Sequence, residues 1–597
     1  MDDGNRVDCR MARGRAICYQ RIQLGMLNHE GGCDMGGTRR WLTSVLAIAG
    51  LSGCAIFHSG AYTNHELKAG DRGSPAQGQQ ADFKVRESRV APTCEKTTPP
   101  PSDPKKQKDV LVLLALSGGG SRAAYFSSLA MLEMQRQKVI LDESQGSETD
   151  LLHEVDAISS VSGGSLAGAY YAISYDPGQE CAAKSKRKWD AKRVEALMTR
   201  DYLSRWVGNW FWPVNVVRYW LTDFDRTDIM AQTFADNLFD KWPTGGDLKL
   251  ADLNPLRPNL ILNSTSGTVT RGGTIHFGDV FTFTHEDFLR ICASASSYSV
   301  ARAVMASATF PGAFNFMTLR DYYPDCDSAQ PVPMKSRSHY LHVFDGGNSD
   351  NLGLTSLRRV IWESLIDRDG EPQVPDKDVV VILVDAFIQS PGADPWDSDA
   401  RASLDFLIDM NFIDATDSLL EKNRERLIAQ FRDGPLFPFG SAQDGSPTRE
   451  SASDACMRFF HGVDHGNCEK PQDWWKKLNL AISQRLKFVE LNFAAVPDVI
   501  EGCDGDRSCL RDQLNRIGTS FKFHTTPNPK TGLTDSEAIA CAVPALFGRA
   551  GDEDAKEACK GLRLADVLGP PATDWAKVRA ILQNPGPQDH AAMDDVE

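Results

Sequence analysis

Short, continuous apolar runs alternate with segments of helical periodicity along the middle of the chain. The run DVLVLLAL, which starts at Asp109, leads into three glycines and then into a segment with apolar residues at Ala124, Leu129, Leu132 and Met134. A near-continuous run of valine and leucine is typical of a strand buried on both faces, as in a parallel sheet with helices on either side. This pattern predicts an α/β fold.

The same order of strand, glycine turn and helix occurs a second time. VDAISSVSGG predicts a strand that runs into a turn, and SLAGAYYAIS continues with helical composition. Further apolar runs predict buried strands at Asn259–Asn263, Tyr340–Phe344 and Val379–Phe387. Because strand and helix patterns alternate, we expect a central, mostly parallel sheet.

The length of the chain predicts more than one structural part. Hydrophobic cores stop growing near ~250–300 residues, and the chain has 597. We expect one large domain over 109–400 and a C-terminal α/β extension over 401–597 that completes or caps it. The extension contains a long amphipathic helix through DFLIDMNFIDATDSLLEKNRERLIAQF and a strand at LKFVELNFAA.

The N-terminal region has the pattern of an export signal. Arg39 and Arg40 precede an apolar run, Trp41–Leu51, which is shorter than the ~20 residues that span a bilayer. The end of this run, LSGC, resembles the lipobox of bacterial lipoproteins, which implies cleavage before Cys54 and lipidation of that cysteine. In this interpretation 35–53 is the signal peptide and 1–34 is an upstream segment from a mis-called start.

A polar linker and an oxidising location follow from the same interpretation. Residues 54–108 contain GSPAQGQQADF and TTPPPSDPKKQKD, which have no apolar period and predict a disordered tether. The resemblance to lipoproteins, with Ala55 after the cysteine, implies a lipid anchor in the bacterial cell envelope, at the outer membrane. An oxidising compartment permits disulfides, and the natural candidates are the close pairs Cys456/Cys468, Cys503/Cys509 and Cys541/Cys559.

Charge and cysteine spacing exclude some classes of function. The formal net charge is -15, whereas nucleic acids are bound by clustered lysine and arginine. We therefore expect no nucleic-acid partner. The cysteines of the folded region form no C-x-x-C motif, so a zinc site is not indicated.

Reactive groups in an α/β sheet collect where strands end and helices begin, because free backbone N–H groups point out of the helix N-terminus. The first glycine turn, Gly118, Gly119 and Gly120, lets the backbone approach a ligand closely, so its amides could surround an oxyanion. Arg122 could hold this loop or add positive potential.

The second glycine turn carries a candidate nucleophile, Ser165. A nucleophile elbow requires small residues two positions before and two positions after the serine. Gly163 and Ala167 meet this requirement, with Gly164 between Gly163 and the serine, although Ala167 departs from the G-x-S-x-G form.

The candidate base is Asp345, because no histidine of the folded region stands at a glycine-rich strand end. Asp345 follows the apolar run YLHVF and precedes two glycines in FDGGNSDNLGL. A carboxylate at such a position can accept a serine proton if burial or hydrogen bonding holds its place and its pKa.

Together, SGGGSR, SGGSLAG and DGG, in this order, resemble the motifs of the patatin-like phospholipases. ASATFPGAF at 306–314 and SDNLGL after the aspartate match further segments of that family, and the resemblance covers about 109–390, with a continuation near RIGTSFKF. It implies that Ser165 is the nucleophile, Asp345 the base of a Ser-Asp dyad, and the Gly118–Gly120 amides with Arg122 the oxyanion site.

The resemblance also implies the fold and the chemistry. The fold is a three-layer sandwich, and the activity is that of a lipid acyl hydrolase of the phospholipase A or lysophospholipase type. The substrates are membrane lipids or lipid esters, cleaved through an acyl-enzyme without a metal or cofactor. A phospholipid, a neutral lipid and a thioester all remain open as substrates.

An aromatic-rich insertion near 200–245 suits a lipid substrate. YLSRWVGNWFWPVNVVRYW combines tryptophans with arginines, a composition favoured at membrane interfaces. The alternative, a pair of helices packed in the core or a lid over the site, is the one we favour from the sequence.

Three other functions compete with the lipid hydrolase. Gly118-x-Gly120-x-x-Ala123 fits a relaxed dinucleotide fingerprint, with Asp142 as ribose-binding acid. A catalytically weak or inactive lipid-binding surface lipoprotein is the second alternative, supported only by Ala167. The third is a Ser-His-Asp hydrolase, in which one histidine substitution would abolish activity.

Overall fold

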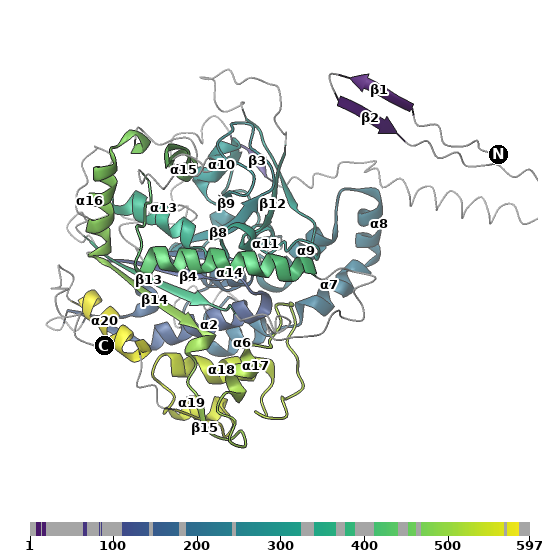
Figure 1. Ribbon diagram of the computed structural model, residues 1–597. Helices are drawn as coiled ribbons and strands as arrows, with labels where there is room; N and C mark the ends of the chain where they lie inside the picture. The colour runs from purple at the N-terminus through teal and green to yellow at the C-terminus, as the bar shows by residue number, and fades with distance from the viewer. Residues whose placement is uncertain are drawn as a thin grey trace, which may run out of the picture. The chain divides into compact units, whose positions relative to one another are not determined.

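Figure 1 shows the computed structural model of the chain. The structure describes residues 8–12, 15–19, 64–67, 83, 85, 110–142, 147–177, 187–241, 246–323, 340–365, 377–387, 411–439, 452–460, 467–565 and 570–583. The chain divides into two compact units, Met1–Ile56 and Phe57–Glu597. In the first unit, β1 (Asp8–Ala12) and β2 (Arg15–Tyr19) form an antiparallel pair. The predicted signal peptide, 35–53, and Cys54 lie outside the described residues.

The second unit is built on one large sheet with the strand order β11-β12-β8-β7-β4-β13-β14, and β9 pairs with β8. Five strands run parallel: β4 (Val110–Leu116), β7 (Ala157–Val161), β8 (Asn259–Ser266), β13 (Asp378–Asp385) and β14 (Leu486–Asn492). The antiparallel strands are β9 (Val280–Thr282), β11 (Met317–Arg320) and β12 (Tyr340–Asp345). The prediction of an α/β fold with a mostly parallel sheet is confirmed.

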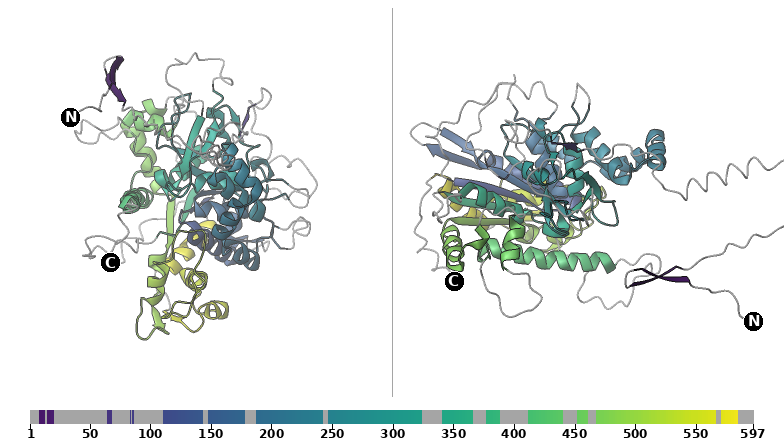
Figure 2. Two further views of the ribbon diagram at one scale, coloured as in Figure 1. Left: turned by 90° about the vertical axis from the view of Figure 1, so that its right-hand side faces the viewer. Right: turned by 90° about the horizontal axis from the view of Figure 1, so that it is seen from above.

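Helices cover both faces of this sheet, which makes three layers (Figures 1 and 2). Alternate residues of β4 enter different cores because side chains of a strand point to opposite faces in turn. Val112 and Leu114 pack with α2 (Gly120–Arg136) and α4 (Gly163–Ile173). Leu111 and Leu113 pack with α13 (Leu354–Leu365), α14 (Asn411–Arg432) and α16 (Gln472–Ser483).

Smaller elements complete the second unit. The helices are α3 (Leu151–Glu154), α6 (Ala191–Met198), α7 (Tyr202–Trp210), α8 (Pro213–Leu221), α9 (Arg226–Leu238), α10 (His285–Arg290), α11 (Val300–Ser307), α12 (Gly347–Asp350), α15 (Ala452–Phe459), α17 (Cys509–Leu514), α18 (Asp535–Leu546), α19 (Glu553–Ala558) and α20 (Pro570–Gln583). The short strands pair as β3 (His65–Glu66) with β10 (Ala293–Ser294), β5 (Lys138–Asp142) with β6 (Ser147–Asp150), and β15 (Val499–Glu501) with β16 (Arg563–Leu564).

The C-terminal extension, 401–597, shares the sheet and the core of the preceding domain, 109–400. Its strand β14 pairs in parallel with β13, and α18 packs on α2. The three disulfide candidates are confirmed: Cys456–Cys468, Cys503–Cys509 and Cys541–Cys559 are bonded. Cys292 is also disulfide-bonded.

Part of the expected tether packs against the folded domain. The strand β3 pairs with β10, so residues 65–66 add to a small sheet. Phe83 is buried in the second core, and the Arg359 guanidinium lies 3.8 Å from the centre of its ring. For these residues the expectation of a disordered linker is wrong, because two apolar side chains, Leu67 and Phe83, find buried positions.

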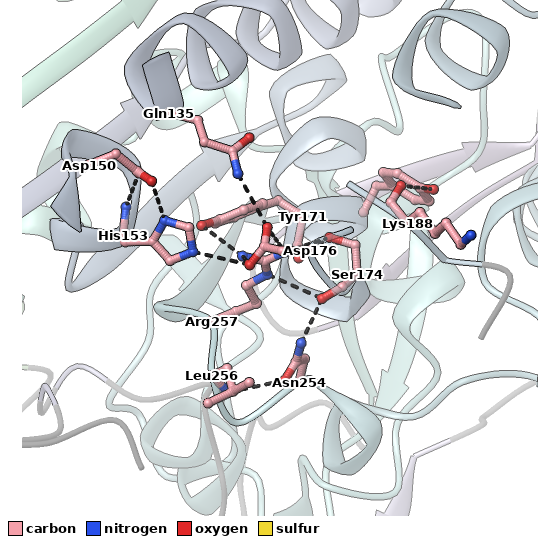
Figure 3. Close-up of polar contacts among 11 residues, drawn as sticks. Gln135, Asp150, His153, Tyr171, Ser174, Asp176, Lys188, Asn254, Leu256 and Arg257 are labelled. Carbon is pink, nitrogen blue, oxygen red and sulfur yellow. Dashed lines mark hydrogen bonds and ion pairs between the residues drawn. The ribbon is translucent and has the colours of Figure 1, made fainter. Parts of the chain in front are cut away.

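A buried ionic cluster fixes the amino ends of β7 and β8 (Figure 3). The His153 ring contacts Asp150 Oδ2 at 2.7 Å and Asp176 Oδ2 at 3.1 Å, and Arg257 donates to both oxygens of Asp176 at 2.9 Å. The hydrogen bond with Asp150, and then that with Asp176, raises the pKa of His153 to about 9. Burial alone would raise the pKa of Asp176, but His153 and Arg257 outweigh it and lower that pKa to about 2. This cluster is remote from the carboxyl end of β7, where the candidate site lies.

The aromatic insertion forms a pair of helices, α7 and α8, that projects from the second unit (Figures 1 and 2). In these two helices only Tyr202 and Asn215 are buried. The expectation of a helix pair packed in the core is therefore wrong, and a lid over the site stays a prediction. Within the described residues, no helix is both long and apolar enough to cross a membrane.

Candidate active site

The two glycine turns lie side by side at the carboxyl ends of β4 and β7. These strands are adjacent and parallel, with Leu116 level with Ser160. A Cβ atom on Gly163 would lie 2.0 Å from the carbonyl oxygen of Gly120, and one on Gly164 would lie 2.6 Å from that of Ser117. Only glycine permits this approach of one backbone to the other.

The residue on the sharp turn after β7 is Ser162. Its backbone has φ 50° and ψ −118°, a left-handed conformation that is strained for a residue with a side chain. Its Oγ donates a hydrogen bond of 3.0 Å to Oδ2 of Asp345. A serine on a strained strand-to-helix turn has the geometry of a nucleophile elbow.

Asp345 is buried at the end of β12, where its register places it beside Ser264 of β8. Its Oδ1 accepts the backbone N–H of Gly347 at 2.8 Å. Burial raises the pKa of Asp345 to about 6, although the hydrogen bonds from Gly347 and Ser162 act in the opposite direction. The carboxylate is thus fixed in place and basic enough to accept a proton near neutral pH.

Ser165, the predicted nucleophile, does not pair with Asp345. It lies inside α4, fully buried, and its Oγ contacts Ser160 Oγ at 3.2 Å and Ser307 Oγ at 2.9 Å. The structure does not bring Ser165 to Asp345, because the turn comes directly after Val161 and the helix has already begun at Gly163.

The sequence around Ser162 also fits an elbow. Ser160 and Gly164 are the small residues two positions before and two positions after Ser162, as an elbow requires. Ala167, which departed from the motif around Ser165, is buried within α4 and has no place in the elbow.

Ser165 instead belongs to a group of buried serines that supports the elbow. Ser307, in the segment ASATFPGAF, accepts the backbone N–H of Ser162 at 2.9 Å through its Oγ, and that Oγ also contacts Ser165. The carbonyl oxygens of Ser307 and Thr309 accept the N–H groups of Gly346 and Asp345. This segment therefore holds both members of the Ser162–Asp345 pair.

The candidate oxyanion donors are only partly those predicted. The N–H of Gly118 donates to the carbonyl of Asn351 at 2.9 Å. In the described part of the chain, the N–H groups of Gly119, Gly120 and Gly163 have no protein acceptor. Gly120 and Gly163 begin α2 and α4, so both helix dipoles favour negative charge at this point.

Arg122 holds the glycine loop. Its buried guanidinium donates to the carbonyl of Ala386 at 2.9 Å and to that of Ile517 at 2.5 Å. The carbonyl of Thr519 lies so close to Gly120 that a Cβ there would be 1.6 Å away. The RIGTSFKF segment therefore closes over the loop, and the role of Arg122 is to position it.

Two site residues were not identified individually from the sequence. Asp350 accepts the N–H groups of Leu352, Gly353 and Thr355, which orders the turn before α13. The carbonyl of Asn351 holds Gly118. Both lie in SDNLGL, so the match of this segment to the family was their only signal.

No described histidine forms a hydrogen bond with Ser162 or Asp345. His342 contacts Thr318 Oγ1 at 3.0 Å, and His153 lies in the ionic cluster at the other end of β7. His339, His461 and His465 lie outside the described residues.

Ser162, on a strained strand-to-helix turn, lies beside the buried carboxylate of Asp345. This arrangement, on an α/β sheet, is typical of proteins that carry a nucleophile at the carboxyl ends of the strands. Residues 114–358, which include both glycine turns and Asp345, match the family model described as patatin-like phospholipase. Over these residues the chain is therefore similar to the patatin-like phospholipases.

Other comparisons add little to this assignment. The crystal structure of VipD from Legionella pneumophila matches with 12% sequence identity over 70% of this chain and 73% of that chain, with a TM-score of 0.21. No curated protein matches the sequence.

Proposed function

We propose that this protein is a lipid acyl hydrolase whose nucleophile is Ser162 and whose base is Asp345. The observation that carries the proposal is the hydrogen bond from Ser162 Oγ to Asp345 Oδ2 on a strained elbow. The family match supports an ester of a lipid as substrate.

In the acylation step, Ser162 Oγ attacks the ester carbonyl while its proton passes to Asp345. The carbonyl oxygen becomes an oxyanion, and its proposed hydrogen-bond donors are the N–H groups of Gly119, Gly120 and Gly163, which have no protein acceptor among the described residues. The intermediate then expels the alcohol, which takes the proton from Asp345. This leaves an acyl ester on Ser162.

Water completes the cycle by the same route. Asp345 accepts a proton from water as the water oxygen attacks the acyl ester. The second intermediate collapses to a free fatty acid, and Ser162 regains its proton. A carboxylate whose pKa is raised to about 6 by burial is suited to both transfers near neutral pH.

The test is hydrolysis of a short soluble ester and of phospholipid, neutral lipid and thioester substrates by three variants. We expect Ser162→Ala and Asp345→Asn each to lose roughly 10³-fold or more in kcat. Ser165→Ala is the matched control, because this serine lies three residues further along the chain, in the helix that begins directly after Ser162. It should retain activity within about tenfold. Full activity of Ser162→Ala would refute the proposal.

We also propose that the protein is exported and lipidated on Cys54, which anchors it in the bacterial cell envelope. This part of the proposal rests on the sequence of residues 35–54. Metabolic labelling with a radioactive fatty acid tests it. The wild-type protein should carry the label and Cys54→Ser should not, whereas equal labelling of both would refute it.

A further inference from the structure

The helices α7 and α8 carry many large apolar side chains that are exposed to solvent. Phe211 is 75% exposed and Trp212 61%, and both lie at the tip where the two helices join. Further exposed apolar residues on these helices are Val207, Val214, Val217, Trp220 and Leu221. Several large exposed apolar side chains on one helical hairpin are typical of an interaction site.

The charges of this segment are of one sign. Between Tyr202 and Thr222 the chain contains no aspartate or glutamate, whereas Arg205 and Arg218 are exposed. The chain as a whole has a net charge of -15. The hairpin is therefore a locally basic surface on an acidic protein, and it complements an anionic surface.

The base of the hairpin is fixed to the domain near the candidate active site. Trp206 Nε1 donates to the carbonyl of Arg226 at 2.9 Å, and its ring packs edge-on against Phe314 at 5.5 Å. The N–H groups of Tyr202 and Leu203 donate to the carbonyl of Phe521. The tip is thus an apolar projection on a rigid support.

Both supports adjoin the proposed catalytic machinery. Phe314 ends the segment whose Ser307 and Thr309 hold the Ser162–Asp345 pair. Phe521 follows Thr519, which lies against Gly120 of the glycine loop. Whatever the tip binds is held at a fixed position relative to Ser162.

We propose that the α7–α8 hairpin is a membrane-docking surface that inserts Phe211 and Trp212 into the interface of an anionic lipid bilayer. Aromatic side chains favour the boundary between headgroups and acyl chains, and arginines beside them attract anionic headgroups. An anionic bilayer presents negatively charged headgroups above an apolar interior. It therefore matches both the basic charge and the exposed apolar side chains of the hairpin. Docking goes beyond the hydrolase function and does not need Ser162.

The test is binding to vesicles by the full chain carrying Cys54→Ser, so that lipidation does not mask the hairpin, and Ser162→Ala, so that lipid is not hydrolysed. The probes are vesicles of phosphatidylcholine alone and of phosphatidylcholine with phosphatidylglycerol. Cosedimentation measures affinity. We expect binding to the mixed vesicles, and weaker binding to the neutral ones.

Three variants locate the contact. Phe211→Ser with Trp212→Ser should weaken vesicle binding at least about tenfold, because each side chain would otherwise leave water on docking. Arg205→Glu with Arg218→Glu should remove the preference for anionic vesicles. The matched control is Phe277→Ser, since Phe277 is 71% exposed elsewhere on the domain, and its binding should not change.

Two readouts separate docking from folding and from catalysis. Each variant should have an unchanged midpoint of thermal unfolding. Each pair of substitutions is also made in the chain that keeps Ser162, and its hydrolysis of the short soluble ester should stay within about twofold of wild type. The proposal is overturned if the protein ignores anionic vesicles, if the aromatic pair has no effect, or if Phe277→Ser is equally impaired. It is also overturned if the hairpin instead mediates a dimer, seen by sedimentation and abolished by the aromatic pair. If no ester is hydrolysed, the proposed hydrolase function is refuted, but vesicle binding still tests the docking proposal.

Discussion

Ser162 and Asp345, which are 183 residues apart in the chain, are joined by a direct hydrogen bond between Oγ and Oδ2. Ser162 follows β7, and Asp345 ends β12. Both strands pair with β8, β7 in parallel and β12 antiparallel, and this pairing brings the two side chains to the same height in the sheet. Because no group stands between them, the proton of the serine can pass to the carboxylate in a single step.

The pH dependence of hydrolysis follows from this relationship. Burial raises the pKa of Asp345 to about 6, and only the ionised carboxylate can accept a proton. We expect kcat/KM for the soluble ester to rise with pH with a midpoint at about 6 and to become level above about pH 7. Ser165→Ala should show the same midpoint. If a single histidine substitution instead abolishes this pH dependence, the result would favour a Ser-His-Asp mechanism.

Asp345→Asn should lose activity and gain stability. The amide can keep both hydrogen bonds and removes the buried charge. Since the folded-state pKa of about 6 lies above the ordinary value of 3.8 for an aspartate, wild-type stability from this group is present below about pH 4 and is lost as pH rises through 6. Above that pH the variant should be more stable by up to about 3 kcal/mol. Urea unfolding at pH 4 and pH 8 measures this, and a less stable variant at pH 8 would show a structural role for the charge.

Ser307→Ala tests the support of the elbow. The substitution leaves the N–H of Ser162 without its acceptor, which costs about 1–3 kcal/mol when the group is buried. We expect kcat for the soluble ester to fall about tenfold, with little change in KM. Ser127→Ala is the matched control, because Ser127 Oγ is buried with no partner among the described residues. Equal effects of the two variants would exclude a positioning role for Ser307.

Gly163→Ala tests the contact between the two glycine turns. The new Cβ would lie 2.0 Å from the carbonyl oxygen of Gly120, so one turn must move away from the other. We expect hydrolysis to fall by roughly 10²-fold or more, with a lower midpoint of unfolding. Gly208→Ala, on α7 with open space around it, should keep activity and stabilise the helix by about 0.5–1 kcal/mol. Wild-type activity in Gly163→Ala would contradict the proposed site.

The buried strands could be predicted from the sequence because each is a continuous apolar run, as in Val110–Leu116 and Asp378–Asp385. Asp345 could be placed for a similar reason, since it ends such a run and two glycines follow. The close cysteine pairs were also identified, because short loops bring their sulfur atoms together. These features are local in the chain.

The nucleophile could not be chosen in this way. Ser162 and Ser165 both stand among glycines and small residues, and the residue at which β7 turns decides between them. That point is set by contacts from distant segments: the Oγ of Ser307, the backbone of Gly120 and the carboxylate of Asp345. Similarly, no pattern in the sequence showed that Arg122 reaches Ile517 rather than an oxyanion.

The exposure of the aromatic hairpin was also misjudged from composition. A run with seven aromatic residues favours a prediction of core packing, because burial of such side chains is usually favourable. Only the packing of α9 and Phe314 against Trp206 shows that the domain core is complete without Phe211 and Trp212.

The most direct test of the central claim is covalent labelling with a fluorophosphonate, which forms a phosphorus–oxygen bond with an activated serine and releases fluoride. The labelled protein is digested, and fragment-ion masses locate the adduct, since Gly163 and Gly164 separate the two serines. We expect one adduct on Ser162, none in Ser162→Ala and slow labelling in Asp345→Asn. An adduct on Ser165, or undiminished labelling of Ser162→Ala, would contradict the account.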